Sequence, residues 1–280
     1  MNLKEKNKAS HELSIEKFLR IKALFDEMNW PYKLEFDDDV FDNFCKMMSE
    51  LDSDQFDLLI TLSKNFLWIQ NNEYMSLFSD AFDCLINNNN HINKIMICPL
   101  LPEEDFGLAK SSISLLYQIK AHINAIQCRY SSFDISYIES PKEIDSYLIE
   151  SDYSFCFVDD FVGTGETAEK ALQYIHNKKI VNDRIFILSL VAMKSGVSYI
   201  NNLGIKVYQS KLCDKGLSIY KNDYFVKLMQ RIEDRIRVKD ENKFGYKGSE
   251  ALVKMIRTPN NTFPIYWLKN KRNKHAPFPR

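Results

Sequence analysis

The sequence lacks three features that would place it in a large class of proteins at once. No apolar stretch is long enough to span a bilayer, so we expect no membrane-spanning helix. The six cysteines stand singly with no CxxC pair, which is evidence against a zinc site or a disulfide framework. Neither sign of charge is in excess, because 37 Lys and Arg residues oppose 38 Asp and Glu residues and leave a net charge of -1. No overall basic field therefore favours nucleic acid or an anionic membrane.

What the chain does contain is typical of a globular protein. Its 280 residues allow one large domain or two of ordinary size, and 45% hydrophobic content with 13% aromatic residues is enough to form real cores. No apolar run follows the charged opening at residues 1–6. We therefore expect a cytoplasmic protein whose cysteines are reduced core residues.

The most informative stretch of the chain is residues 155–167. Its first four residues, 155–158, are apolar or aromatic and predict a buried parallel strand. Asp159 and Asp160 follow at the carboxyl end of that strand, where open α/β sheets bind their ligands. Two more apolar residues lead into Gly163-Thr164-Gly165-Glu166-Thr167, and the apolar spacing that follows predicts a helix beginning at this loop.

This order of residues suits a ribose phosphate. The two glycines allow several N–H groups to point one way, and the helix start adds partial positive charge, so the loop favours a phosphate. The hydroxyls of Thr164 and Thr167 can donate to the same oxygens, and the carboxylates of Asp159 and Asp160 can accept from vicinal ribose hydroxyls. An ordinary strand-to-helix turn, with Asp and Gly present for turn geometry, is the alternative interpretation.

The strand, the acidic pair and the Thr-Gly-Glu-Thr turn together resemble the ribose-phosphate loop of type I phosphoribosyltransferases. The resemblance covers about residues 91–212 and implies an α/β fold with a parallel sheet. It implies that Asp159 and Asp160 are the catalytic pair that holds the ribose. It also implies a magnesium ion carried by the diphosphate of the substrate, with no dedicated metal ligands in the protein. The residues it assigns to substrate binding are Val162, Gly163, Thr164, Gly165, Glu166 and Thr167.

We expect two domains, a helical one at residues 1–90 and a phosphoribosyltransferase-like one at residues 91–280. Apolar residues at helical spacing predict four helices in the first domain: one from Ser14, one capped by Asp37 or Asp38, one that starts after Ser53 and one that carries Tyr74. The asparagine run at 87–90 is a polar break that marks the boundary. Because the helical runs are acidic, packing of residues 14–86 against the following domain, or docking of a partner protein or nucleoprotein through them, is favoured over DNA binding.

The second domain is predicted to alternate strands and helices, which requires a parallel sheet with covering helices. The expected strands are 95–98, 135–138, the stretch at 155–158, 184–191 and 206–209, and the expected helices are 107–125, 141–148 and 195–202. A further short helix is expected at Leu252 and Val253.

The loop after the first of these strands corresponds to the diphosphate-binding loop of the family. It carries three consecutive acids, 103–105, which are an awkward lining for a diphosphate unless magnesium lies between them. The alternative is that these acids favour the dipole of the helix they precede. Lys110 and Ser111 are the residues we expect to contact the diphosphate.

Two further segments bear on catalysis. The segment at about 126–141 corresponds to the mobile loop that active members of the family close over the substrate, but it is short and offers only Arg129 and Tyr130. Lys194 follows a predicted strand at its carboxyl end and can contact a phosphate or a base, with an ordinary solvated lysine as the alternative.

The segments 244–250 and 258–267 resemble the closing segment of phosphoribosyltransferase-like proteins from bacterial conflict and antiphage loci, some of them associated with retrons. That resemblance implies that Tyr266 or Trp267 stacks on a nucleobase, with Asn260 and Asn261 as hydrogen-bonding partners. Alternatively the segment only fastens the chain to the sheet. The basic residues near the end of the sequence are most simply a solvated stretch, with nucleic-acid contact as the less favoured interpretation.

Three functions remain open at the level of sequence, and the least favoured of them is a transcriptional regulator built on the same fold. The resemblance implies a phosphoribosyltransferase-like effector of a bacterial defence system that binds 5-phosphoribosyl diphosphate or a nucleotide and acts at the ribose anomeric carbon. The alternative is a catalytically inactive module that senses a ribose phosphate and docks a partner. The acidic diphosphate loop and the short 126–141 segment favour the alternative, and fold alone does not decide whether the protein is an enzyme.

Overall fold

The computed structural model describes residues 13–33, 39–147 and 152–280. The chain forms two compact units: unit 1 combines residues 1–68 with 216–280, and unit 2 is residues 69–215. This division differs from the boundary at residue 90 that the asparagine run suggested. Asn89 is 2% exposed, and its side-chain amide donates to Leu85 O and to the Tyr208 hydroxyl, both at 2.7 Å. Asn89 is thus part of the folded core of unit 2, whereas Asn87, Asn88 and Asn90 are exposed.

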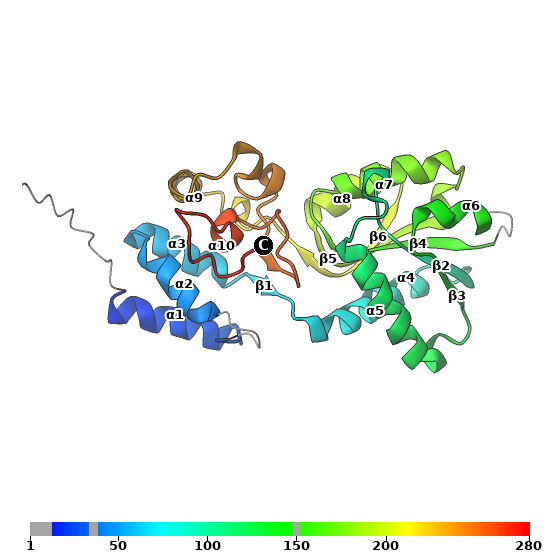
Figure 1. Ribbon diagram of the computed structural model, residues 1–280, viewed down its shortest axis with the longest axis horizontal. Helices are drawn as coiled ribbons and strands as arrows, with labels where there is room; N and C mark the ends of the chain where they lie inside the picture. The colour runs from blue at the N-terminus through cyan, green and yellow to red at the C-terminus, as the bar shows by residue number, and fades with distance from the viewer. Residues whose placement is uncertain (1–12, 34–38, 148–151) are drawn as a thin grey trace, which may run out of the picture. The chain divides into compact units, whose positions relative to one another are not determined.

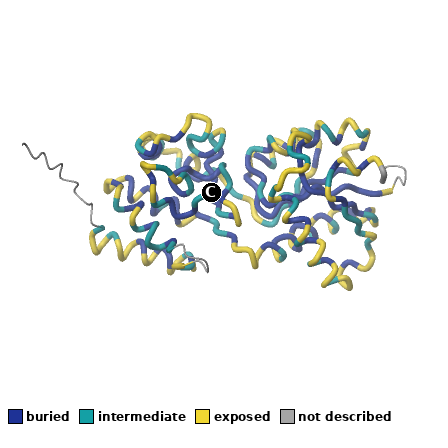
Figure 2. The backbone as a smooth tube through the Cα atoms, viewed as in Figure 1, coloured by how far each residue is buried: buried dark blue, intermediate teal, exposed yellow. Residues whose placement is uncertain are grey.

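Unit 2 is built on a five-stranded parallel sheet with the order β3-β2-β4-β5-β6. Its strands are β2 (Lys94–Pro99), β3 (Asp134–Tyr137), β4 (Ser154–Val162), β5 (Ile185–Met193) and β6 (Lys206–Cys213). The expected parallel α/β fold is confirmed. Strand β4 is central, and it is buried from Ser154 to Val158 because helices cover both faces of the sheet (Figure 2).

Five helices cover this sheet. Two lie on one face and three on the other (Figure 1): α4 (Tyr74–Asn87) and α5 (Ser111–Ala125) on the first, and α6 (Ile144–Tyr147), α7 (Glu166–Asn177) and α8 (Lys194–Asn202) on the second. Helix α4 was expected in the helical domain, but it packs against β5 and β6. Its apolar stripe correctly indicated a buried face, and the surface that buries it is the sheet.

Unit 1 contains the first three expected helices. Serine or aspartate side chains cap all three: Ser14 accepts from Lys17 N, Asp39 from Asp42 N, and Asp52 from Gln55 N in a capping box. The second helix therefore begins after Asp39, and Asp37 and Asp38 lie outside the described residues. The helices of this unit are α1 (Ile15–Glu27), α2 (Val40–Ser49), α3 (Ser53–Ser63), α9 (Asp223–Arg235) and α10 (Pro264–Trp267).

The remaining strands differ from the sequence-based expectation. The expected short helix at Leu252 and Val253 is wrong, because β7 (Val253–Lys254) pairs in parallel with β1 (Leu67–Trp68). Leu67 N donates to Leu252 O at 2.8 Å, which joins the two chain segments that make up unit 1. A strand of two residues leaves no periodicity that distinguishes it from one helical turn.

An aromatic cluster forms the core of unit 1. The Phe66 ring lies 4.8 Å from that of Tyr266 and 5.2 Å from that of Phe278, and Trp30 lies 6.0 Å from Phe278. Such pairs contribute roughly 0.5–1.5 kcal/mol each beyond their buried area. Residues near the end of the sequence are therefore core members of the unit that begins with α1.

One buried carboxyl group makes unit 1 sensitive to pH. Glu233 of α9 is 0% exposed, and both of its oxygens accept the Phe244 N–H, at 2.9 and 3.0 Å. Burial raises the pKa of Glu233 to about 8 from its ordinary 4.5, although the Phe244 N–H and the charge of Lys243 act in the opposite direction. The folded state therefore holds a proton that the unfolded state releases.

We expect the free energy of unfolding of the protein to fall by roughly 4–5 kcal/mol as the pH rises from about 4.5 to about 8, because the unfolded state binds fewer protons in that window. Urea denaturation at pH 5, 6.5 and 8.5 measures this. In Glu233→Gln, whose amide oxygen still accepts the Phe244 N–H, the loss should disappear. An equal loss in that variant would show that another group is responsible.

Candidate functional site

The site begins with two aspartates at the carboxyl end of β4. Asp159 is half-buried, and its Oδ1 accepts the Asp160 N–H at 2.9 Å and the Ser111 hydroxyl at 3.4 Å. Asp160 is 7% exposed, and its Oδ2 accepts the Tyr74 hydroxyl at 3.4 Å. Asp159 is therefore the more accessible acceptor, while Asp160 is held from the α4 side of the sheet.

The carboxylates of Asp159 and Asp160 lie so close together that their electrostatics favour a bound proton, or a hydrogen-bond donor supplied by a ligand. Burial, and then the adjacent charge of Asp160, raise the pKa of Asp159 well above its ordinary value, while its hydrogen bonds from Asp160 N and Ser111 act in the opposite direction. Two neighbouring carboxylates in a partly buried place repel each other, and hydroxyl groups of a ligand would relieve this repulsion by donating to them.

The loop after β4 is shaped by two glycines. Gly165 has φ +88°, a left-handed conformation that glycine adopts at little cost, and it forms the N-cap of α7 without a side-chain cap. Thr164 Oγ1 accepts the Glu166 N–H at 3.4 Å. In the described part of the chain, the N–H groups of Thr164, Gly165 and Thr167 donate to no protein acceptor. These donors at a helix start form an arrangement that suits an anion.

The first turn of α8 holds this loop in place. A Cβ atom on Gly196 would lie 2.2 Å from Gly163 O, and one on Gly165 would lie 2.9 Å from Tyr199 Cδ1. Gly163 and Gly165 are buried, Thr164 and Glu166 are half-buried, and Thr167 is exposed. The side chain of Val162 is 4% exposed and belongs to the apolar core, so this expected ligand residue offers only its backbone.

The loop after β2 lies along α7. Phe106 packs edge-on against Tyr174 with ring centroids 5.0 Å apart, and Glu104 pairs with Lys170 at 3.0 Å. Lys110 pairs with Asp105 at 2.7 Å. Two of the three acids that made this loop an awkward diphosphate lining are thus neutralised by lysines. The hydroxyl contact of Ser111 to Asp159 brings the end of this loop to the aspartate pair.

The basic side chains of Lys194 and of the 126–141 segment form ion pairs with aspartates of the protein. Lys194 begins α8 and pairs with Asp214 at 3.0 Å. Arg129 forms an ion pair with Asp83, which also accepts the Tyr130 hydroxyl at 3.0 Å. Arg129 would therefore have to leave Asp83 to approach a ligand.

Tyr266 and Trp267 belong to unit 1, and their side chains have partners within that unit. Tyr266 is 0% exposed, its hydroxyl shares a hydrogen bond of 2.9 Å with Ser63 Oγ, and its ring packs between those of Phe66 and Phe278. The half-buried Trp267 donates its Nε1–H to Thr262 O at 2.7 Å. The expected base-stacking role of Tyr266 is corrected to a core role in unit 1, because no face of its ring is accessible.

The segment around Asn260 and Asn261 is likewise part of the framework of unit 1. Asn260 O accepts the Tyr246 N–H at 2.9 Å, and Asn261 O accepts the Ala251 N–H at 3.0 Å and the Ser249 hydroxyl at 2.9 Å. These backbone contacts fasten residues 258–262 to residues 245–251. The sequence left open that this segment fastens the chain to the sheet, whereas these contacts fasten it within unit 1.

Sequence patterns missed Tyr74 as a member of the site. It begins α4, is 2% exposed and donates to Asp160 across 86 positions of sequence. Its place in an apolar helical run indicated only a core residue, and no local feature assigns a partner to its hydroxyl.

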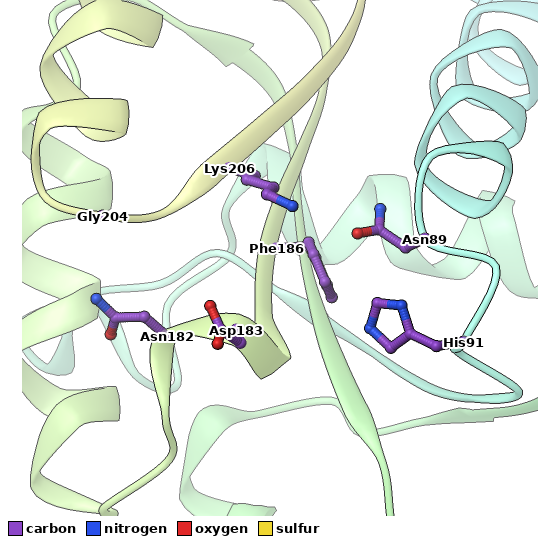
Figure 3. A pocket seen from close by; sticks show the side chains of 7 residues that line it. All are labelled: Asn89, His91, Asn182, Asp183, Phe186, Gly204 and Lys206. Atoms are coloured by element: carbon purple, nitrogen blue, oxygen red, sulfur yellow. The ribbon is translucent and has the colours of Figure 1, made fainter.

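A cavity of about 180 Å³ lies elsewhere on unit 2, at the amino ends of β5 and β6 (Figure 3). Because the strands are parallel, this is the edge opposite the loop after β4. It contains none of the expected site residues; those that line it are Asn89, His91, Asn182, Asp183, Phe186, Gly204 and Lys206.

The described residues contain no group of three or more His, Cys, Asp or Glu side chains able to hold a metal ion. The aspartate pair still fits a magnesium ion that arrives with a diphosphate, because Mg²⁺ in such sites takes one or two carboxylates and completes its shell with phosphate oxygens and water. Within the same residues, no helix is both long and apolar enough to cross a bilayer.

Comparison with known proteins identifies the family. None of the curated protein sequences matches this chain. Among solved structures it is similar to the crystal structure of orotate phosphoribosyltransferase from Aeropyrum pernix, with a TM-score of 0.32 and 10% identity over 60% of this chain and 78% of that chain. The family model PRTase-CE matches residues 41–280, which include unit 2 and most of the described part of unit 1. The chain therefore belongs to the PRTase-CE family.

Proposed function

We propose that unit 2 binds a 5-phosphoribosyl ligand, either 5-phosphoribosyl diphosphate or a nucleotide, and acts at its anomeric carbon. The observation that carries this proposal is the loop at 163–167. The N–H groups of Thr164, Gly165 and Thr167 have no protein acceptor among the described residues, and the loop closely follows the half-buried Asp159 in the chain. A sugar phosphate supplies the phosphate and the hydroxyl groups that these two features take.

For this reaction the protein has to position the ribose and to stabilise the charge that develops on it. When diphosphate leaves the anomeric carbon, positive charge builds on the sugar, and a carboxylate held beside the ribose stabilises it. Asp159 takes this place in the proposal, and Asp160 is the second acceptor, oriented by Tyr74. Ser111 contacts Asp159 and fits the diphosphate side of the ligand. Magnesium bound to the diphosphate would supply charge neutralisation of the leaving group.

A second function, ribose-phosphate sensing without transfer, is favoured by a specific observation. The two cations best placed to assist a leaving diphosphate are already paired, Lys110 with Asp105 and Arg129 with Asp83. In this alternative the phosphate loop still binds its ligand, and residues 14–86 dock a partner protein or nucleoprotein. A role in bacterial antiphage defence, including retron-associated systems, is the setting that the sequence resemblance suggests for either function.

The test is ligand binding by calorimetry with magnesium and 5-phosphoribosyl diphosphate, ribose 5-phosphate or AMP. In Asp159→Asn with Asp160→Asn, we expect affinity to fall about tenfold to a hundredfold, because two acceptors are lost at roughly 1 kcal/mol or more each. Removing two negative charges would by itself favour an anion, so a loss of affinity reports on the hydrogen bonds. Asp159→Asn should be at least as stable as the original protein, because it removes the repulsion between the two neighbouring carboxylates.

The matched control is Asp152→Asn with Asp183→Asn, which removes two exposed carboxylates of unit 2 outside the site. It should bind as the original protein does. Unchanged affinity in the Asp159 and Asp160 variant would contradict the proposal. Release of diphosphate from 5-phosphoribosyl diphosphate, or of a free base from a nucleotide, on incubation with magnesium separates the enzyme from the sensor.

A further inference from the structure

The charged side chains of residues 251–280, hereafter the basic segment, are all positive. They contain no Asp or Glu, whereas the whole chain has a net charge of -1. The basic residues are Lys254, Arg257, Lys269, Lys271, Arg272, Lys274 and Arg280. A run of this kind within a nearly neutral protein concentrates a local positive field.

Among the residues that the structure describes, these cations have no carboxylate partner. Elsewhere in unit 1 the helices pair their charges, as in Arg20 with Asp57 at 2.7 Å and Lys64 with Glu27 at 3.1 Å. Over residues 13–33, 39–147 and 152–280, no basic side chain of the basic segment forms an ion pair with a carboxylate. Four of these side chains are exposed together in the turn at 269–274, which lies in the red part of unit 1 (Figure 1).

The turn that presents them is fixed by two asparagines. Asn270 Oδ1 accepts the N–H groups of Arg272 and Asn273 at 2.8 and 2.9 Å, and Asn270 Nδ2 donates to Ile236 O at 2.9 Å. Asn273 is 2% exposed and donates to Ile265 O and Leu268 O, both at 3.0 Å. The backbone positions of the lysines and the arginine are thus set before any partner binds, which lowers the entropic cost of binding.

Two more cations lie at the base of the same hairpin-like segment. Thr258 Oγ1 donates to Phe278 O at 2.8 Å, which brings the chain after Met255 beside the chain before Arg280. Burial, and then the positive charge of Arg257, lower the pKa of Arg280.

We propose that the basic segment is a docking surface for the phosphodiester backbone of a nucleic acid. Contacts to a phosphate backbone need exposed Lys and Arg side chains and little apolar surface. Ile256 is the one strongly exposed large hydrophobic residue of the segment, and the turn at 269–274 exposes none. An anionic membrane surface would require apolar side chains to insert, and a stable protein interface would require buried aromatic or aliphatic anchors.

The experiment is fluorescence anisotropy of the full chain with a labelled 20-nucleotide single strand of mixed sequence, as DNA and as RNA, from 50 to 200 mM salt. We expect sequence-independent binding with a Kd of about 10⁻⁴ to 10⁻⁶ M near physiological salt. In Lys271→Gln with Arg272→Gln and Lys274→Gln, the affinity should fall at least tenfold. The slope of log K against log salt should become shallower by about 2, at about 0.7 per lost contact.

The matched control replaces three exposed cations of unit 1 outside the segment, Lys33→Gln with Lys227→Gln and Arg231→Gln, and should bind as the original protein does. No binding at 50 mM salt would overturn the proposal, as would equal losses in both triple variants. Binding to phosphatidylserine vesicles or polyglutamate as tight as to the oligonucleotide would also overturn it. Sugar-phosphate binding by unit 2 should be unchanged in both variants, so this proposal and the proposed function fail separately.

Discussion

Replacing Gly196 with alanine is expected to abolish sugar-phosphate binding and to lower the free energy of unfolding by about 3 kcal/mol. The new Cβ would lie 2.2 Å from Gly163 O and 3.0 Å from Gly163 C. Both are backbone atoms, so no side-chain rotation relieves the overlap. Helix α8 must then move away from the loop. The N–H groups that follow Gly163 in the loop would no longer point toward one phosphate.

The direction of this effect is informative because helix propensity predicts the opposite. Alanine within a helix is favoured over glycine by about 1 kcal/mol. A destabilised Gly196→Ala therefore reports on the contact with Gly163 and not on the helix itself. Ser198→Ala, at an exposed position of the same helix, is the matched control and should be neutral.

Thermal unfolding and calorimetry with 5-phosphoribosyl diphosphate measure the two consequences of the Gly196 substitution. We expect at least a hundredfold loss of affinity, more than for the aspartate variants, because the whole set of phosphate donors is displaced. If Gly196→Ala were as stable as the original protein and bound the ligand equally well, the close approach of α8 to the loop would not matter for the site.

The sequence predicted the centre of unit 2 well for a physical reason. A strand buried on both faces needs a continuous apolar run, and β4 has one from Phe155 to Val158. Acids and glycines that interrupt such a run at its carboxyl end have few structural uses, so their spacing carried information on the site. The strand, the loop and the start of α7 were all predicted from this one stretch.

The sequence could not predict which unit an amphipathic helix belongs to. The apolar stripe of α4 specifies that one face is buried, but the same stripe fits a helical bundle or a sheet. Its assignment depends on long-range contacts, such as those of Asn89 with Tyr208 and of Tyr74 with Asp160. Neither contact has a local pattern.

The aromatic residues near the end of the sequence were ambiguous in the same way. An aromatic side chain serves equally to stack on a base or to fill a core. Tyr266 fills a core because Ser63, about two hundred positions earlier, supplies a partner for its hydroxyl. The family match from residue 41 to residue 280 agrees with this arrangement, since it extends over residues of both units.

Glu250→Ala is expected to destabilise unit 1 by about 3–5 kcal/mol, because the carboxylate of Glu250 organises the junction at which the chain enters this unit again. The residue is 7% exposed. Its Oε2 accepts the N–H groups of Leu217 and Ser218 at 3.0 and 2.7 Å, and its Oε1 accepts the Ser218 hydroxyl at 2.5 Å. Truncation would leave the buried Leu217 N–H without its acceptor and would remove the two part-buried hydrogen bonds from Ser218.

The backbone of Glu250 also contributes to the stability of unit 1. Glu250→Gly is therefore the variant to compare with Glu250→Ala. Its φ is +53°, its carbonyl accepts the Gly216 N–H at 2.8 Å, and its N–H donates to Phe244 O at 2.7 Å. Glu250→Gly relieves the backbone strain but loses the same side-chain bonds, so it should be destabilised less than Glu250→Ala by about 1 kcal/mol.

Urea denaturation followed by tryptophan fluorescence measures this ranking, because Trp30, Trp68 and Trp267 all lie in unit 1. Glu241→Ala, an exposed acid of the same unit, should be neutral. Equal stability of Glu250→Ala and Glu241→Ala would contradict the role of the buried carboxylate. Because Glu250 lies outside unit 2, partial denaturation of Glu250→Ala with sugar-phosphate binding retained would show that unit 2 folds and functions independently of unit 1.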